Sequence, residues 1–156
     1  MRIRSFIAAL ALVIPVAACG GKAAPETTTT GANSGSADTR SLFERLGGLP
    51  AIEAVVKEFV KTTGADPRIT QFFTNADIPR LEKLMVEQIC EATGGPCKYT
   101  GTSMKESHTG MKVKEEHFAA FIEDLTATLD KFKVGEREKS EVLAAFNSMK
   151  ADVVEP

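Results

Sequence analysis

The first of only two histidines in this 156-residue chain, His108, lies in a stretch whose composition suits ligand binding. The stretch, residues 94–110, reads GGPCKYTGTSMKESHTG, and segments rich in Phe, Val, Leu and Ile flank it. A lone imidazole on a short helix between apolar helices can offer one nitrogen ligand to the metal of a flat, apolar cofactor. The alternative is a histidine that caps a helix or lies exposed in the bend, and the residues alone leave both open.

Two cysteines, Cys90 and Cys97, flank the Gly-Gly-Pro sequence of the same region. In an exported chain, such an even pair indicates a disulfide. Two reduced, buried cysteines are the alternative. A zinc site made from these cysteines, His108 and the second histidine, His117, does not match the tight-turn spacing of structural zinc ligands. His117 begins the next predicted helix, where partial exposure is expected.

The first 18 residues predict an export signal. Two arginines near the start precede an apolar run at positions 6–14 that is too short to span a membrane as a helix. Residues 16–19, VAAC, resemble the lipobox of bacterial lipoproteins, in which Cys19 is acylated after cleavage. We therefore expect a lipoprotein on the periplasmic face of a membrane, and Gly20 favours the outer membrane. A plain secretory signal is the alternative.

Residues 20–40 contain no large apolar side chain and are dense in Gly, Ser, Thr and Ala. Such a segment cannot bury enough surface to order itself. It predicts a disordered tether of about 25 Å that holds the following domain off the membrane. A glycosylated or cleaved segment is the alternative.

Residues 41–154 predict one all-α domain, because apolar residues recur at helical spacing and no segment alternates with period two. Expected caps are Ser41, Asp66, Asp77 and either Thr102 or Ser103. Helices are expected at about 42–46, 50–63, 77–92, 104–109, 114–132 and 136–153, with a short helical turn at 66–73. The formal net charge of -2 and the absence of tryptophan give no indication of a nucleic-acid partner.

The chain resembles the group 1 truncated globins. The resemblance is carried by LFERLGG at 42–48, AIEAVVKEF at 51–59, ADPRITQFF at 65–73, GGPCKYTG at 94–101 and MKESHTG at 104–110. It extends in order over the whole predicted domain. It implies a two-over-two helical sandwich around haem b, with His108 as the proximal ligand of the iron.

The resemblance also implies roles for residues around the cofactor. Phe73 takes the position of a phenylalanine wedged against the porphyrin. Lys105 is a candidate partner for a haem propionate. Taken singly, Phe73 could be a core residue and Lys105 a solvated charge. The residues expected along the haem edge are Tyr99, Thr100, Met104 and Lys105.

The distal side departs from the family pattern. Val60 and Met85 occupy the positions where group 1 members commonly place a Tyr and a Gln, and Leu81 stands at the gate position. An apolar wall donates no hydrogen bond to bound oxygen, so we expect faster oxygen release than in relatives with Tyr and Gln. Gln88, one turn beyond Met85, is a candidate replacement donor, although a helix-face role is the alternative.

The expected function is reversible binding of oxygen, nitric oxide or carbon monoxide at haem iron, and not catalysis. A nitric oxide dioxygenase or a peroxidase-like enzyme is an alternative, but the first needs an electron donor of unknown identity and the second needs distal polar groups. A further alternative is electron transfer with the Met85 thioether as sixth ligand. Met85 as flexible core filler is the simpler interpretation.

Overall fold

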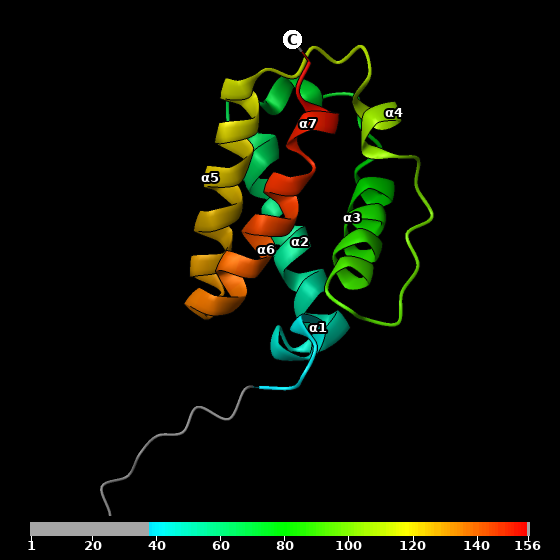
Figure 1. Cartoon of the computed structure of the whole chain (residues 1–156). Helices are drawn as coiled ribbons and strands as arrows, with labels where there is room; N and C mark the ends of the chain where they lie inside the picture. Colours follow the sequence, from blue (N-terminus) through cyan, green and yellow to red (C-terminus); the bar gives the residue numbers. More distant parts are fainter. Residues whose placement is uncertain (1–37, 156) are drawn as a thin grey trace, which may run out of the picture. The chain divides into compact units, whose positions relative to one another are not determined.

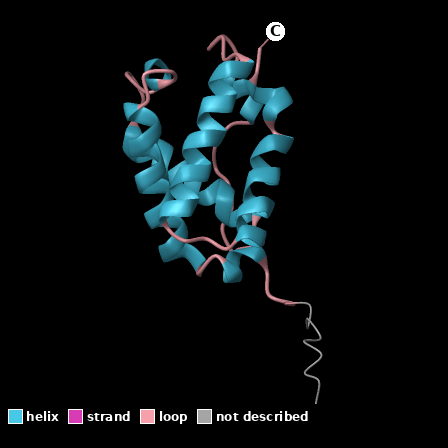
Figure 2. Ribbon diagram, turned by 90° about the vertical axis from the view of Figure 1, so that its left-hand side faces the viewer, coloured by secondary structure: helices cyan, strands magenta, loops and turns pink. Residues whose placement is uncertain are grey.

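The structure is a computed structural model that describes residues 38–155, and within that range it contains helices and loops but no strand (Figures 1 and 2). The all-α prediction is confirmed. The predicted signal peptide, Cys19 and nearly all of the predicted tether lie outside the described residues. The helices are α1 (Leu42–Arg45), α2 (Gly48–Ala65), η1 (Thr70–Phe72), α3 (Ile78–Ala92), α4 (Met104–His108), α5 (Glu115–Lys131), α6 (Glu136–Ser148) and α7 (Lys150–Val153).

Three of these elements differ from the sequence-based boundaries. The helical turn predicted at 66–73 is reduced to η1, three residues long. Helix α2 begins at Gly48, before Pro50, because Gly47 adopts a left-handed backbone with φ +97° and turns the chain directly out of α1. Pro50 then falls within the first turn, where its missing N–H costs no helical bond. The predicted last helix is broken at Met149, which ends α6 and precedes α7. No helix within residues 38–155 is both long and apolar enough to cross a bilayer.

The expected caps are present except at Asp66, which accepts the Arg68 N–H at 2.8 Å in the turn before η1, while η1 itself has no side-chain cap. The Ser41 hydroxyl accepts the Glu44 N–H, and the Glu44 carboxylate in turn accepts the Ser41 N–H at 2.9 Å. Asp77 caps α3 by accepting the Arg80 N–H at 3.1 Å. Of the two candidates before α4, Ser103 is the cap. Each cap satisfies N–H groups that have no partner inside the helix.

The long helices form two packed pairs, α2 with α3 and α5 with α6, and α2 also packs against α5 (Figure 1). Their apolar stripes meet in one core, to which all four contribute. The largest fully buried side chain among the described residues is Phe59, which is 1% exposed. The buried core residues are Ile52, Val56, Phe59, Val60, Met85, Ile89, Cys90, Leu125, Leu129, Val142 and Phe146.

Asp124 on α5 carries a carboxylate oxygen that is buried without a hydrogen-bond partner. Burial, and then the neighbouring Asp66 carboxylate, raise the pKa of Asp124 above its ordinary value. The folded state therefore holds a proton on this group more tightly than the unfolded chain does. This proton linkage makes the free energy of unfolding fall as the pH rises from the unfolded pKa, about 4, through the raised pKa of the folded state.

Asp124→Asn removes the charge and is expected to increase the free energy of unfolding at pH 7 by about 0.5 kcal/mol, since the side chain is only partly buried and water screens part of the penalty. The gain should shrink toward pH 4, where the wild-type carboxylate takes up its own proton. Urea unfolding at the two pH values measures this difference. A gain that is equal at both pH values would contradict the assignment.

Candidate functional site

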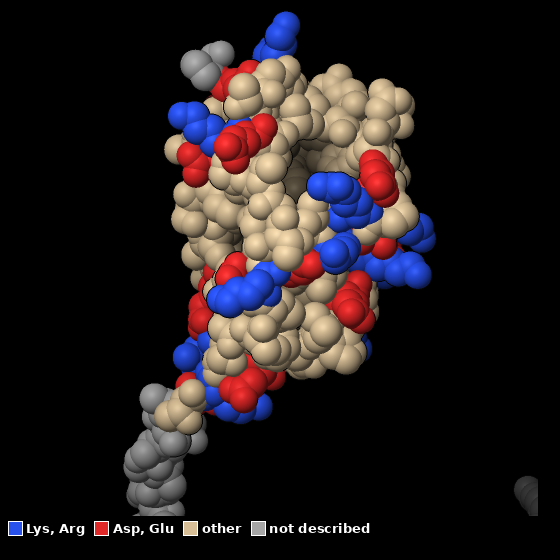
Figure 3. All heavy atoms as spheres, turned by 90° about the vertical axis from the view of Figure 1, so that its right-hand side faces the viewer, with Lys and Arg blue, Asp and Glu red and all other residues tan. Residues whose placement is uncertain are grey.

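A largely apolar cavity of about 330 Å³ lies between α3, α4, α5 and the end of α6. His108 reaches it from α4, and the other walls supply mostly apolar side chains. Figure 3, which views the side where α3 and α4 lie, shows a hollow bordered by basic and acidic side chains. The predicted site residues that line the cavity are Phe73, Leu81, Met85, Gln88, Tyr99, Met104 and His108.

The His108 ring is oriented by a hydrogen bond within α4. Its Nδ1 lies 2.8 Å from the carbonyl oxygen of Met104, and that oxygen can only accept, so Nδ1 carries the proton and donates. The neutral ring then keeps the lone pair on Nε2. A metal-binding imidazole is held in this way, with its second nitrogen bonded to a carbonyl that fixes the ring and the tautomer. His108 thus offers Nε2 as a ligand from the cavity wall.

Helix α4 is short, and its ends are fixed by local hydrogen bonds. The Ser103 hydroxyl accepts the Glu106 N–H at 3.2 Å, and the Glu106 carboxylate accepts the Ser103 N–H at 3.1 Å. The Ser103 hydroxyl also donates to the Glu106 carboxylate at 2.8 Å, and this bond, followed by the bond from the Ser103 N–H, lowers the pKa of Glu106. A single turn of helix is marginal on its own. The reciprocal cap therefore helps to hold His108 in place.

The loop between α3 and α4 is tied to α3 by two glutamates. The Glu91 carboxylate accepts the Tyr99 N–H at 3.0 Å, and Glu87 accepts both the N–H and the hydroxyl of Thr100, at 3.0 and 2.7 Å. Hydrogen bonds to the charged form lower the pKa of Glu91, chiefly through Tyr99, and the pKa of Glu87, chiefly through the Thr100 hydroxyl. Tyr99 itself donates to the Thr102 carbonyl at 2.8 Å and lines the cavity.

The structure joins Cys90 and Cys97 in a disulfide, with Cα atoms 5.7 Å apart. This separation lies within the range that a disulfide spans without backbone movement. Cys90 is fully buried at the end of α3, so the bridge attaches the loop to the core. Both cysteines are therefore used in a covalent bond and are not metal ligands.

Leu81 and Met85, the α3 residues predicted for the distal wall, line the cavity together with Phe73. Met85 is 8% exposed. None of the three carries a hydrogen-bond donor. Gln88 also lines the cavity. Its Nε2 donates to the Met149 sulfur at 3.1 Å, and this bond joins α3 to the end of α6. The thioether is a weak acceptor.

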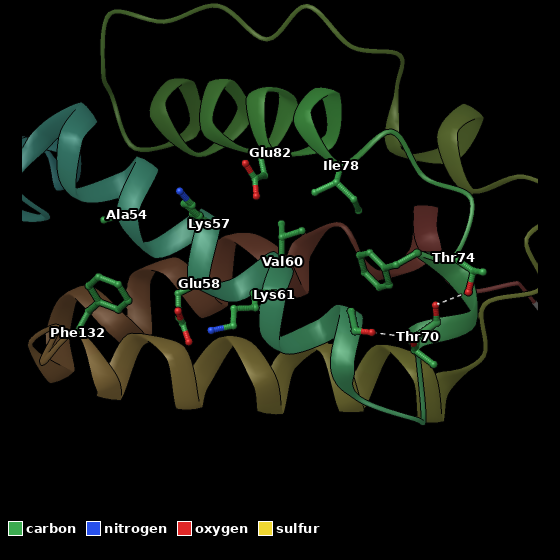
Figure 4. A pocket seen from close by; sticks show the side chains of 12 residues that line it. Ala54, Lys57, Glu58, Val60, Lys61, Thr70, Thr74, Ile78, Glu82 and Phe132 are labelled. Atoms are coloured by element: carbon green, nitrogen blue, oxygen red, sulfur yellow. Dashed lines mark hydrogen bonds between the residues drawn. The ribbon is translucent and has the colours of Figure 1, made fainter.

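Val60 and Lys105 do not line the cavity. Val60 is 3% exposed and faces a second hollow, of about 630 Å³, next to α2 (Figure 4). That hollow shares Phe73 with the His108 cavity, but charged residues such as Lys57 and Glu82 line it and it has no imidazole. Lys105 is exposed on α4, so its contact with a propionate stays a prediction. Thr100 is also exposed and bonds to Glu87 instead.

Sequence reasoning missed several residues that line the cavity, among them Met111, His117 and Val153. His117 packs edge-on against Phe72, with ring centroids 5.0 Å apart, and its Nδ1 accepts the Lys114 N–H at 3.0 Å. It therefore caps α5 while facing the cavity. Its sequence, Glu-His-Phe at a helix start, carried no signal for this second role.

A family model of bacterial-like globins matches residues 41–155, which is the whole helical region described above. The chain belongs to the bacterial-like globins. Among curated relatives of this globin, a group 1 truncated haemoglobin of Tetrahymena pyriformis is 34% identical over 115 residues, which are 74% of this chain and 95% of the relative. The group 1 truncated haemoglobin GlbN of Mycolicibacterium paratuberculosis is 33% identical over 117 residues, covering 75% and 86% of the two chains.

Solved structures agree with the fold. The Fe(III) form of the Tetrahymena pyriformis truncated haemoglobin superposes with a TM-score of 0.72 at 33% identity, covering 75% of this globin and all of that chain. The 2/2 haemoglobin of Synechococcus sp. PCC 7002, in a cyanomet state with covalently attached haem, gives a TM-score of 0.70 at 29% identity, covering 74% and 98%. The predicted family and the two-over-two globin fold are confirmed.

A globin implies a haem cofactor, and the residues present fit one. The cavity walls are apolar, as the faces of a porphyrin require. Within residues 38–155, His108 uses Nδ1 for the Met104 carbonyl, and no hydrogen bond engages its Nε2. Among the described residues, His108 on α4 would hold the iron, and Phe73, Leu81 and Met85 would face the opposite side of the cofactor.

Proposed function

We propose that this globin holds haem b through Nε2 of His108 and reversibly binds a diatomic gas, oxygen, nitric oxide or carbon monoxide. When bound, the haem supplies the iron at which the gas is held. The observation that carries the proposal is the hydrogen bond from Nδ1 of His108 to the Met104 carbonyl, because it fixes the ring of a cavity-lining histidine and leaves Nε2 as the nitrogen with a lone pair for a metal.

The residues of the distal wall favour binding over catalysis. Leu81 and Met85 line the site with apolar side chains and supply neither an acid nor a base. Cleavage of an O–O bond in peroxidases is assisted by polar distal groups, which these side chains do not provide. These residues therefore favour reversible binding of a gas that is not chemically converted.

The absorption spectrum of the purified protein tests the proposal in its oxidised, reduced and carbon monoxide forms. The reduced protein is expected to show five-coordinate haem that converts fully on addition of carbon monoxide. Failure to bind haem would refute the proposal. A six-coordinate reduced spectrum that Met85→Leu makes five-coordinate would instead favour electron transfer with the Met85 sulfur as sixth ligand.

Met85→Gln is expected to slow oxygen release about tenfold, because a side-chain amide on the distal wall donates a hydrogen bond to the ligand that is worth about 1.4 kcal/mol. Stopped-flow measurement of the oxygen dissociation rate gives this ratio. Met85→Leu, which keeps the volume and adds no donor, should release oxygen as the wild type does. Slow release from the wild type itself would point to another donor, for which Gln88 is the nearest candidate.

We also propose that the protein is an exported lipoprotein, attached through acylated Cys19 to the periplasmic face of the outer membrane. The proposal is supported by the lipobox-like sequence before Cys19 and by the tether composition that follows. The Cys90–Cys97 disulfide supports it independently, because such bridges persist in oxidising compartments outside the cytosol.

Expression of the full-length chain in a bacterium that processes lipoproteins, with a labelled fatty acid in the medium, tests the anchor. The wild type should carry the label and sediment with outer membranes. Cys19→Ser should lose the label and appear in the soluble fraction. Equal membrane association of the two proteins would refute the anchor.

A further inference from the structure

The loop that follows His108 is held by Glu155, which lies close to it in space although 45 positions away along the chain. The Gly110 N–H donates to one oxygen of the Glu155 carboxylate, and the Lys112 N–H donates to the other at 3.2 Å. The Glu155 N–H in turn donates to the Val113 carbonyl at 2.8 Å. Three hydrogen bonds therefore join one residue to this loop.

The backbone conformation of the loop at residues 110–112 explains why the loop binds a carboxylate. Gly110 and Lys112 both have left-handed conformations, with φ of +85° and +56°. The Gly110 and Lys112 N–H groups both point to the Glu155 carboxylate, and a concave pair of backbone N–H donors of this kind binds an anion. A lysine seldom adopts positive φ unless its surroundings impose it. The Glu155 carboxylate is the anion that satisfies these N–H groups.

The segment that carries Glu155 is itself fixed against the same side of the cavity. Val153 on α7 lines the cavity together with Val113 of the loop. Lys150, at the start of α7, forms an ion pair with Glu115, and its Nζ lies 5.9 Å from the centroid of the Phe118 ring. Helix α7 also packs against α4 (Figure 1). The segment that carries Glu155 is therefore held in place by contacts other than those with the loop.

We propose that Glu155 is a positioning residue for His108, and this inference rests on the proposed haem function. The path from one to the other is short: the carboxylate fixes the N–H groups of Gly110 and Lys112, and the Met111 N–H between them donates to the His108 carbonyl at 3.0 Å. Loss of the carboxylate frees the loop. The His108 backbone and the direction of its Nε2 then become less defined.

Glu155→Ala in the full haem-loaded protein tests the role through the iron–histidine stretching band of the reduced protein, measured by resonance Raman spectroscopy. The band is expected to shift or broaden, and haem transfer to excess apomyoglobin should accelerate about threefold to tenfold. Glu155→Gln keeps one amide oxygen as acceptor and should fall between the wild type and the alanine variant. Asp152→Ala removes a carboxylate from the exposed face of α7 and is the matched control, expected to behave as the wild type.

A Glu155→Ala protein whose band and haem transfer rate match those of Asp152→Ala would overturn the inference while leaving the haem function intact. Faster haem transfer with an unchanged band would also overturn it, since that result describes general loosening and not a change at His108. Absence of an iron–histidine band from the wild type would contradict the proposed function itself. The three results are distinguishable in one set of samples.

Discussion

His108→Gly is expected to weaken haem binding more than about 100-fold, because it removes the imidazole that offers the cavity a metal ligand with its lone pair already oriented. Titration of the metal-free protein with haem, followed by absorption spectroscopy, measures the change. Added imidazole should restore much of the wild-type spectrum, since it can enter the space that the side chain leaves. If added imidazole restores the spectrum, the variant is still folded, and its weaker haem binding results from the missing bond between iron and histidine.

His117→Asn is the matched control for that experiment. It removes the other imidazole that lines the cavity, and the Asn side chain can still accept the Lys114 N–H at the start of α5. Its haem affinity should stay within a few-fold of the wild type. If His108→Gly retained haem with an unaltered spectrum, or if His117→Asn lost it, the assignment of the ligand to His108 would be wrong.

Phe59→Ala is expected to lower the free energy of unfolding by about 3–5 kcal/mol, the usual cost of emptying a buried aromatic site. Phe59 is 1% exposed at the centre of the contact between α2 and α5, and its ring meets that of Phe121 edge to face with centroids 4.9 Å apart. Phe121 also lines the His108 cavity, so removal of the Phe59 ring also removes a packing contact from a residue of the cavity wall. Urea unfolding of the haem-free protein, followed by circular dichroism, measures the loss.

Phe132→Ala provides the comparison for the same measurement. Phe132 lies just beyond α5 and is 39% exposed, so its removal should cost less than about 1 kcal/mol. Similar losses for the two variants would mean that Phe59 does not lie in the common core of α2 and α5.

Helical spacing and capping residues were sufficient to predict most of the fold. The apolar stripe of α5 and the caps at Ser41 and Asp77 depend on residues only a few positions apart in the sequence. Patterns over such short separations can be recognised from the sequence alone. The helix break at Met149 was not predictable in this way. Apolar residues continue at helical spacing from α6 through α7, and no Gly or Pro marks the interruption.

The candidate site was predicted through its resemblance to a family, and periodicity alone gave only an all-α domain. The contacts that escaped prediction join residues far apart in the chain. The amide of Gln88 meets the Met149 sulfur 61 positions away, and Glu155 meets Gly110 across 45 positions. Val60 was placed by analogy on the distal wall, whereas its side chain faces the hollow beside α2. The packing of whole helices decides which of two neighbouring cavities a core residue such as Val60 faces. The local sequence does not contain this information.

The bridge between Cys90 and Cys97 closes a covalent ring at the end of α3, and the chain that leaves this ring carries Tyr99 to the cavity. The ring is complete as soon as the two thiols are oxidised, with no contribution from a cofactor. One wall of the cavity is therefore preorganised, and less chain has to be ordered when the cofactor enters. In the reduced protein more of the chain has to be ordered when the cofactor enters, so the reduced protein should bind the cofactor more weakly than the oxidised protein.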